Sequence, residues 1–258
     1  KTDFGAFFAT YGSYFSYCLY PAAGMCIFKG FKKKNQNVLA WTLLVISYFL
    51  AVYYSNSYNG SKVRELFHYD VNNPNFFISI LAYLFWAILY SWVPLVFYFI
   101  LDDSNPNTLI CVGVVILLGG VISDCVNLWL KQVASRPRYK YLITLQEPSE
   151  SFKNWWEMNP YKAGNDDNFK SWPSGNMTIA TMMMSLPLLL NNLKCKNKYL
   201  NIIGYIIGLL FVIVYGYNRI HMGNHFLSDV CFGTLFTYLI YSFIDFSFFF
   251  NSIDNSAH

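Results

Sequence analysis

Three short stretches, far apart in the chain, carry residue types that together could bind and transfer a phosphoryl group. They are Lys131 with Arg138, the turn Pro173-Ser174-Gly175-Asn176, and Arg219 with His225 and Asp229. Arg presents a planar fork of donors that matches phosphate oxygens, and Lys adds a compact positive charge. If the three stretches meet in the fold, the chemistry they favour is phosphoryl transfer.

The third stretch gives the strongest local signal. His225 and Asp229 are four residues apart, so on a helix they would share one face. A carboxylate that accepts from one imidazole nitrogen fixes the tautomer and leaves the other nitrogen free to attack. A lone buried His–Asp pair is more often structural, but Arg219 nearby favours catalysis. Asp229 is therefore predicted to orient His225 as a nucleophile.

The second stretch leads directly into an apolar segment. Ser174 can cap a helix, Gly175 allows a close backbone approach, and a helix N-terminus binds anions readily. By itself this pattern is typical of a well-capped membrane helix. It becomes a candidate phosphate site only together with the other two stretches.

The first stretch ends another apolar segment. Asp124, Asn127 and Lys131 would share one helical face, and an ionisable Asp124 inside a membrane span is a candidate for a functional site. Its expected partner is Lys131 or one of the two arginines, Arg136 and Arg138, that flank Pro137. A structural ion pair is an equally good interpretation of Asp124. Alone, these cations would be headgroup contacts.

The composition indicates that membrane helices position these stretches. The 258 residues are 55% hydrophobic and only 12% charged, whereas soluble domains carry about 25% charged residues. The apolar blocks are long enough to cross about 30 Å of hydrocarbon as helices. Seven spans are predicted, at about 10–30, 38–57, 76–101, 109–130, 176–193, 199–217 and 225–250. We expect an all-α polytopic transmembrane bundle, with residues 1–258 forming a single domain.

Lysine clusters predict the orientation of this bundle. Lysines at positions 29, 32, 33 and 34 follow the first span, and others at 194, 196 and 198 separate the fifth from the sixth. By the positive-inside rule both clusters are cytoplasmic. Counting spans then puts 58–75, 131–175 and 218–224, and so all three stretches, outside. We expect a plasma-membrane protein with a cytoplasmic C-terminus and, as an eighth span, a further helix before residue 1.

Together the three stretches resemble the type-2 phosphatidic acid phosphatase superfamily, which shares its site with vanadium haloperoxidases. Its first motif is Lys, six residues, then Arg-Pro; here Lys131 and Arg138 keep the spacing, but Pro precedes the Arg. The third motif is Ser-Arg, five residues, His, three residues, Asp, and here Asn218 replaces the Ser. The resemblance covers about 38–250, a six-helix core, and leaves the helix at about 10–30 as an addition.

The resemblance implies a role for each matching residue. His225 would attack phosphorus and form a phosphohistidine while Asp229 orients it. The phosphoryl group would be held by Lys131, Arg138, Ser174, Gly175 and Arg219. The implied reaction needs no metal or other cofactor. The expected partners are a lipid phosphate or pyrophosphate substrate and membrane lipids, with no nucleic acid, and the oligomeric state is open.

Asn176 departs from the family pattern. The second motif is Pro-Ser-Gly-His, and the resemblance implies that this His protonates the leaving oxygen, which Asn cannot do. Losing a general acid typically costs about 10²–10⁴-fold in rate. Three explanations are open: an introduced substitution, a natural slow or inactive member, or a proton supplied by His221. The alternative function is a weak or inactive member that binds or transports a lipid phosphate.

Overall fold

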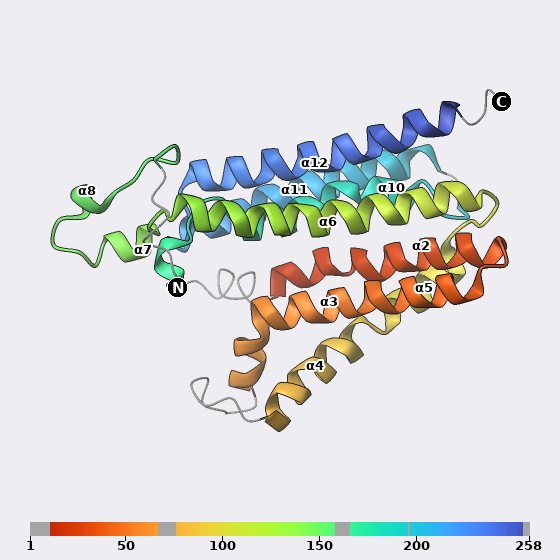
Figure 1. Cartoon of the computed structure of the whole chain (residues 1–258), viewed down its shortest axis with the longest axis horizontal. Coiled ribbons are helices and arrows are strands. Elements are labelled where there is room, and N and C mark those ends of the chain that lie inside the picture. Colours follow the sequence, from red (N-terminus) through yellow and green to blue (C-terminus); the bar gives the residue numbers. More distant parts are fainter. Residues whose placement is uncertain (1–10, 67–75, 158–165, 196, 255–258) are drawn as a thin grey trace. The chain divides into compact units, whose positions relative to one another are not determined.

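The computed structural model describes residues 11–66, 76–157, 166–195 and 197–254 (Figure 1). Within these ranges every regular element is a helix, apart from an isolated bridge between Leu101 and Leu193. Five helices among the described residues are long and apolar enough to cross a membrane: Asn37–Ser57, Phe76–Ile100, Pro106–Leu142, Tyr199–His221 and Leu227–Phe246. The prediction of an all-α polytopic bundle is confirmed, and the chain is a multi-pass membrane protein.

The other two predicted spans are also helical but shorter or interrupted. The first contains α2 (Leu19–Lys33), and its residue 10 lies outside the described residues. The fifth is divided into α9 (Gly175–Thr181), a 3-10 turn η2 (Met182–Ser185) and α10 (Leu186–Leu190). Pro187 explains the interruption, because it cannot donate to the carbonyl four residues earlier and its ring crowds that carbonyl.

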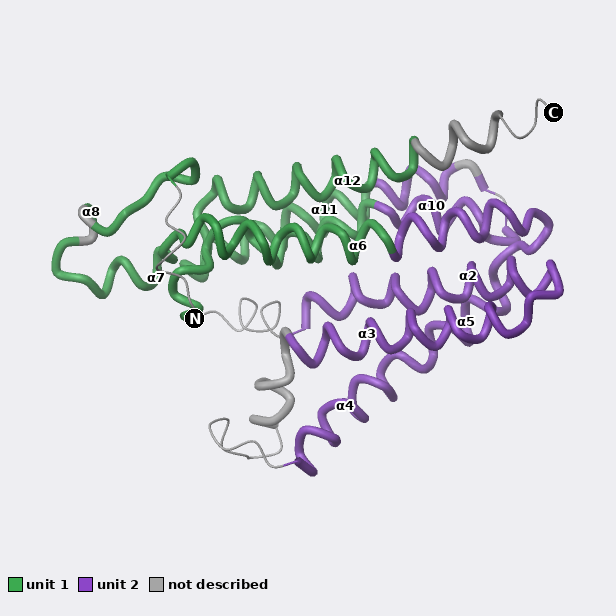
Figure 2. Tube along the Cα trace, in the orientation of Figure 1, with its two compact units in different colours: residues 1–9, 118–184, 206–258 green, residues 10–117, 185–205 purple. Residues whose placement is uncertain are grey.

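The chain divides into two compact units, shown in Figure 2. Of the described residues, 118–157, 166–184 and 206–254 belong to unit 1, and 11–66, 76–117, 185–195 and 197–205 belong to unit 2. All three stretches that the sequence analysis singles out belong to unit 1. One transmembrane domain over 1–258 stays a prediction.

In unit 2, α2 packs against α3 (Asn37–Leu66) and α5 (Trp92–Ile100), and α3 packs against α4 (Phe76–Tyr90). Lys29 is buried, and its Nζ donates to the carbonyls of Tyr98 at 3.0 Å and Leu101 at 2.8 Å. It therefore satisfies carbonyls at the end of α5, a favourable place for a cation. Lysines 32–34 are exposed, as expected for loop cations, whereas Lys29 is not.

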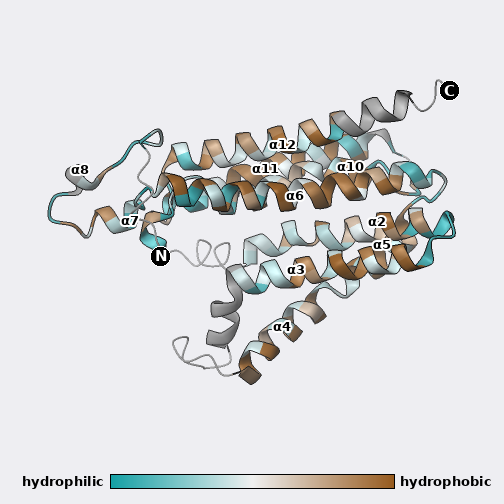
Figure 3. Cartoon of the chain, viewed as in Figure 1, coloured by the Kyte–Doolittle hydropathy of each residue, from teal (hydrophilic) through white to brown (hydrophobic). Residues whose placement is uncertain are grey.

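Unit 1 contains the second half of α6 (Pro106–Ala134), α9, the larger C-terminal part of α11 (Lys198–His221) and all of α12 (Leu227–Asp254). Its core cluster is formed by Met177, Ala180, Val212, Tyr215 and Val230, and α9 packs on α12. Figure 3 shows that the segment after α6 is mostly hydrophilic, whereas α6, α11 and α12 are mostly hydrophobic. The polar chemistry of unit 1 therefore gathers where its helices begin or end.

Candidate active site

The first stretch lies in the last turns of α6. Asp124 and Asn127 are buried, and Lys131, one turn later, is half-buried. The Nδ2 of Asn127 donates to Thr178 Oγ1 at 3.1 Å and approaches the carbonyl of Pro173 at 3.4 Å. Asn127 thus ties the end of α6 to the second stretch, which holds Lys131 on the side of the Pro-Ser-Gly turn.

The two arginines that follow α6 have different partners. The helix ends because Ser135 adopts a left-handed backbone (φ 45°), after which Pro137 cannot continue it. Arg136 is buried; its Nη1 donates to Asp229 Oδ1 at 2.5 Å and to Ser228 Oγ at 2.8 Å. Its guanidinium also lies 4.3 Å from the ring centroid of Phe226. Arg136 therefore pairs with a carboxylate at the start of α12 and does not reach out as a surface cation.

Arg138, in contrast, makes its ion pair at the surface. Its Nη2 donates to Asp167 Oδ1 at 2.8 Å and its Nε to the Asp167 carbonyl at 2.9 Å. The Asp167 side chain is 69% exposed, while that of Arg138 is 12% exposed. Since exposed pairs are weak, an incoming phosphate can compete with Asp167 for this guanidinium.

The second stretch is held against α12 by its backbone. The N–H of Ser174 donates to the carbonyl of Asp229 at 3.1 Å. Gly233, four residues after Asp229 on α12, lies against the Pro-Ser-Gly turn. A Cβ at Gly233 would lie 2.8 Å from the Ser174 carbonyl oxygen. Only glycine permits this approach without displacing backbone. The close contact fixes Ser174 beside the residues that begin α12.

The third stretch places His225 just before α12, in the turn that joins it to α11. The ring is buried, and Nδ1 lies 2.7 Å from the carbonyl oxygen of Ser171. A carbonyl only accepts, so this bond requires the proton on Nδ1 and leaves a lone pair on Nε2. Asp229 Oδ2 lies 3.9 Å from Nδ1, too far for a hydrogen bond. The structure differs here from the expectation that Asp229 orients the ring.

Asp229 instead organises the groups around His225. It is fully buried, and its oxygens accept from Arg136, from Ser171 Oγ at 2.5 Å and from the N–H of Phe226 at 2.9 Å. The Asp229 carboxylate holds the Ser171 side chain, and the main-chain carbonyl of the same Ser171 holds the imidazole of His225. Asp229 thus acts on His225 through one intermediate residue, and Arg136 neutralises the buried charge.

The environment of His225 keeps its ring neutral. Burial lowers the pKa of His225 well below its ordinary value, and the positive charges of Arg138 and Lys131, with a smaller effect from Arg219, lower it further. The hydrogen bond with Ser171 acts in the opposite direction but does not prevail. A neutral imidazole with a free lone pair at Nε2 is the form that can attack phosphorus.

Several buried polar atoms in this region have no hydrogen-bond partner among the described residues, including Asn127 Oδ1 and Trp172 Nε1, and three of them belong to groups suited to a phosphate. These three are Ser174 Oγ, Arg219 Nε and His225 Nε2, one from the second stretch and two from the third. Buried polar atoms in native proteins are nearly always paired, so each unpaired one calls for an explanation. A donor-rich guanidinium, a hydroxyl and an imidazole lone pair are together what a bound phosphoryl group would satisfy.

Arg219 and His221, both at the end of α11, have different surroundings. Arg219 is buried at the end of α11, donates to the Asn218 side chain and lies over the ring of Tyr215, 5.2 Å from its centroid. His221 is exposed and stacks on Tyr217, with 5.8 Å between ring centroids. This stacking at an exposed position does not favour His221 as a proton donor.

Asn176 and two residues that the sequence analysis did not single out complete the region. Asn176 is half-buried in the first turn of α9, and the hydroxyl of Tyr215 lies 3.5 Å from its Oδ1. Tyr215 is four residues before Arg219 on α11, a spacing that could have indicated it. Ser171 contributes a main-chain carbonyl, for which the sequence offers no signal.

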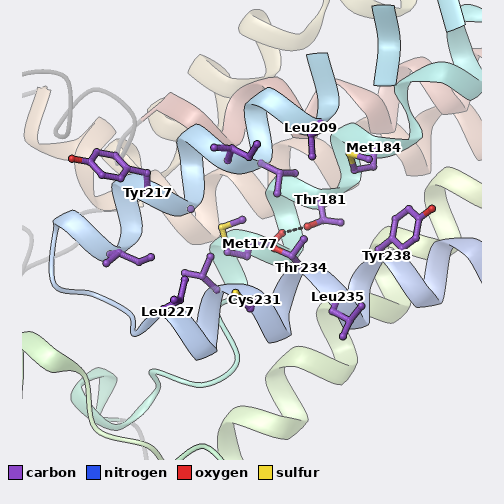
Figure 4. A pocket seen from close by; sticks show the side chains of 15 residues that line it. Met177, Thr181, Met184, Leu209, Tyr217, Leu227, Cys231, Thr234, Leu235 and Tyr238 are labelled. Atoms are coloured by element: carbon purple, nitrogen blue, oxygen red, sulfur yellow. Dashed lines mark hydrogen bonds between the residues drawn. The ribbon is translucent and has the colours of Figure 1, made fainter. Parts of the chain in front are cut away.

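An apolar groove of about 580 Å³ adjoins these residues within unit 1 (Figure 4). It lies between α11 and α12 and includes residues directly next to three site positions: Met177, Gly216 and Val230. Buried Thr181 lines it beside Met177, whose carbonyl accepts from Thr181 Oγ1 at 2.7 Å. Leu209, Tyr217, Leu227 and Leu235 along it are exposed. The groove can hold a hydrocarbon chain.

Comparison with known proteins identifies the family. The family model of the PAP2 superfamily matches residues 108–251, more than half of the chain, beginning later than the 38–250 expected from the resemblance. No curated protein and no solved structure matches the chain significantly. No group of three or more His, Cys, Asp or Glu among the described residues could hold a metal ion. The match spans the segments that carry Lys131, Ser174 and His225. The chain therefore belongs to the PAP2 superfamily, whose members are typically phosphatases acting on phosphate esters.

Proposed function

We propose that the protein removes phosphate from a lipid phosphate or lipid pyrophosphate through a phosphohistidine at His225. The main support for this proposal is that Ser174 Oγ, Arg219 Nε and His225 Nε2 are buried and have no hydrogen-bond partner in the part of the chain that the structure describes. Two are suited to phosphate oxygens and the third is a nucleophile whose tautomer is fixed by Ser171. A site built only to bind would not need an oriented lone pair.

The reaction proceeds in two displacements. His225 Nε2 forms a bond to phosphorus as the bond to the leaving oxygen breaks, and that oxygen takes up a proton. Water then attacks the phosphohistidine, inorganic phosphate leaves, and the imidazole returns to its neutral form. Lys131, Arg138, Arg219, Ser174 and the backbone at Gly175 hold the equatorial oxygens and stabilise their charge in the transition state. No metal takes part.

The position of the groove supports a lipid substrate. Met177, Gly216 and Val230 line it and directly follow Asn176, Tyr215 and Asp229 in the sequence, so the groove runs along the helices that carry these residues. Its lining is almost wholly apolar side chains from helices that can cross a membrane. A water-soluble phosphate ester would leave this surface unused.

The site is proposed to face the exterior of the plasma membrane, with the C-terminus in the cytoplasm. Exposed lysines 32–34 support this orientation, since positive loops favour the cytoplasmic side. These lysines lie at the end of α2, which ends at Lys33. Three candidate spans follow before the end of α6 that carries Lys131, so that end is proposed to lie on the opposite side of the membrane from the lysines. Residues 67–75, part of the predicted outer loop at 58–75, lie outside the described residues.

Restoring the expected acid tests the proposal. Phosphate release from phosphatidate and from a polyprenyl pyrophosphate is measured for the Asn176 protein, for Asn176→His, and for Asn176→His/His225→Ala. We expect Asn176→His to release phosphate about 10²-fold faster or more, the range of general-acid effects, and the double variant to be inactive. Inactivity of every form, together with thermal stabilisation by inorganic phosphate, would favour the alternative of a binding or transport protein.

A further inference from the structure

We propose that Tyr215 donates the proton that the leaving oxygen takes up, in a site where position 176 cannot supply it. The proposal rests on the function proposed above and names a further catalytic residue for it. Its basis is the placement of one buried phenol beside two groups of the phosphate site. Asn176 lies near its hydroxyl, and the guanidinium of Arg219 lies over its ring.

The hydroxyl of Tyr215 reaches the first turn of α9. Its oxygen lies 3.5 Å from Asn176 Oδ1, at the outer limit of a hydrogen bond. Asn176 is only two residues after Ser174, whose Oγ is buried and has no partner among the described residues. The phenol oxygen therefore lies next to position 176, where the family's acid is expected, and two residues from Ser174.

The ring of Tyr215 is fixed by its surroundings. Tyr215 is 1% exposed and belongs to the core cluster with Met177, Val212 and Val230. The guanidinium of Arg219 lies 5.2 Å from its ring centroid. Burial in this cluster restricts rotation of the ring, whereas the O–H bond can still rotate.

The proton balance of the step is complete. When His225 Nε2 attacks phosphorus, the bond to the leaving oxygen breaks and that oxygen takes the phenol proton, which leaves a phenolate beside the positive charge of Arg219. When water later attacks the phosphohistidine, its proton returns to the phenolate. Phenols hold their proton at neutral pH, so the donor is ready, but a phenol is a weaker acid than an imidazolium. The Asn176 protein should therefore be slower than Asn176→His.

Tyr215→Phe tests the proposal, because it removes the hydroxyl and keeps the ring packed under Arg219. The variant is made in the Asn176 protein and in Asn176→His, and phosphate release is measured with phosphatidate. We expect a loss of about 10-fold or more in the Asn176 protein and less than about 3-fold in Asn176→His, since the new imidazole takes over as the acid. With p-nitrophenyl phosphate, whose leaving group needs no proton, neither background should lose activity. Vanadate binding should be unchanged.

Tyr205→Phe, on the exposed face of the same helix, is the matched control and should change nothing. Equal losses in both backgrounds would show a structural role and overturn the proposal. No loss in the Asn176 protein would overturn it as well. An inactive Asn176 protein beside an active Asn176→His would refute the role of Tyr215 but keep the proposed function, while inactivity of every form would end both.

Discussion

The carbonyl oxygen of Ser171 lies 2.7 Å from Nδ1 of His225, and this main-chain contact sets the tautomer of the proposed nucleophile. The Asp229 carboxylate, at 3.9 Å, acts on the ring only through Ser171. Ser171→Ala removes this link but keeps the carbonyl, whose residue is still held by the bond from its N–H to the Arg136 carbonyl at 3.0 Å. We expect kcat to stay within about 3-fold, while the lost bond to a charged group lowers the free energy of unfolding by about 1.5–3 kcal/mol. Thermal unfolding and phosphatase kinetics are compared between Asn176→His and Asn176→His/Ser171→Ala. A 100-fold loss of kcat in the double variant would contradict the expectation.

The two arginines around Pro137 should differ in what they support. Arg136→Ala leaves Asp229 buried without its cation, which costs about 3–5 kcal/mol of stability. Arg138→Ala breaks a pair with exposed Asp167, worth about 0–1 kcal/mol, but removes a phosphate ligand. Unfolding midpoints and vanadate affinity of both variants test this contrast. A stable Arg136→Ala, or unaltered vanadate affinity in Arg138→Ala, would contradict the assignment.

The depressed pKa of His225 determines the acid side of the pH profile. Because the folded pKa lies below the ordinary value near 6.5, the ring stays neutral and kcat/KM for an aryl phosphate holds as pH falls through 6.5. Stability, in contrast, does depend on pH in this range. Below pH 6.5 His225 binds a proton in the unfolded chain but not in the folded protein, so the free energy of unfolding decreases as the pH falls.

Arg138→Ala provides the internal check on this pH profile. Arg138 is the largest of the charges that lower the pKa of His225, so its removal should move the acid limb of kcat/KM toward higher pH. The measurement is kcat/KM for p-nitrophenyl phosphate over a series of pH values, for the protein with Arg138 and for its Arg138→Ala variant. A limb that stays in place, or one that moves to lower pH, would show that Arg138 does not act on His225.

The close approach of α12 to the Pro-Ser-Gly turn should be needed for phosphate binding. In Gly233→Ala the new methyl meets the Ser174 carbonyl oxygen at 2.8 Å, so the turn must shift. We expect a stability cost of about 1–3 kcal/mol and weaker vanadate binding by the folded protein. Gly119→Ala is the control: its methyl meets the Tyr241 ring at 2.5 Å, away from the site, and should cost stability without changing affinity. Equal affinities of the two variants would argue against the role of this contact.

The apolar groove should determine the preference for long-chain substrates. Cys231 lines it on α12 and is exposed, so Cys231→Trp narrows the groove without changing the phosphate ligands. In Asn176→His, we expect KM for a long-chain phosphatidate to rise about tenfold, while values for p-nitrophenyl phosphate stay constant. Cys125→Trp, at an exposed position of α6 outside the groove, is the control. A parallel change with both substrates would exclude the groove as the chain-binding surface.

The sequence predicted the helices and the cations better than the contacts among them. Long apolar blocks suffice to indicate α6, α11 and α12, because lipid leaves the backbone no alternative to a helix. The His225–Asp229 spacing was interpreted as one helical face, but α12 begins at Leu227, so His225 precedes the helix and the spacing rule does not apply to it.

Other features could not be read from residue types. Arg136 and Arg138 flank the same proline, and residue types alone do not tell which of them pairs with Asp229. The contact of Ser171 with His225 uses a main-chain carbonyl 54 residues away, which has no side-chain signature. The roles of the individual site residues remain predictions, and family membership is confirmed.

Trapping the phosphoenzyme shows whether His225 carries the phosphoryl group. The protein and its His225→Ala variant are mixed with phosphatidate labelled with ³²P in the phosphate, quenched in alkali within milliseconds to seconds, digested and mapped. We expect label on the peptide that contains His225, stable in alkali and lost in acid as expected for a phosphohistidine, and no label in His225→Ala. Phosphate release with no labelled peptide, or label on another residue that persists in His225→Ala, would contradict it.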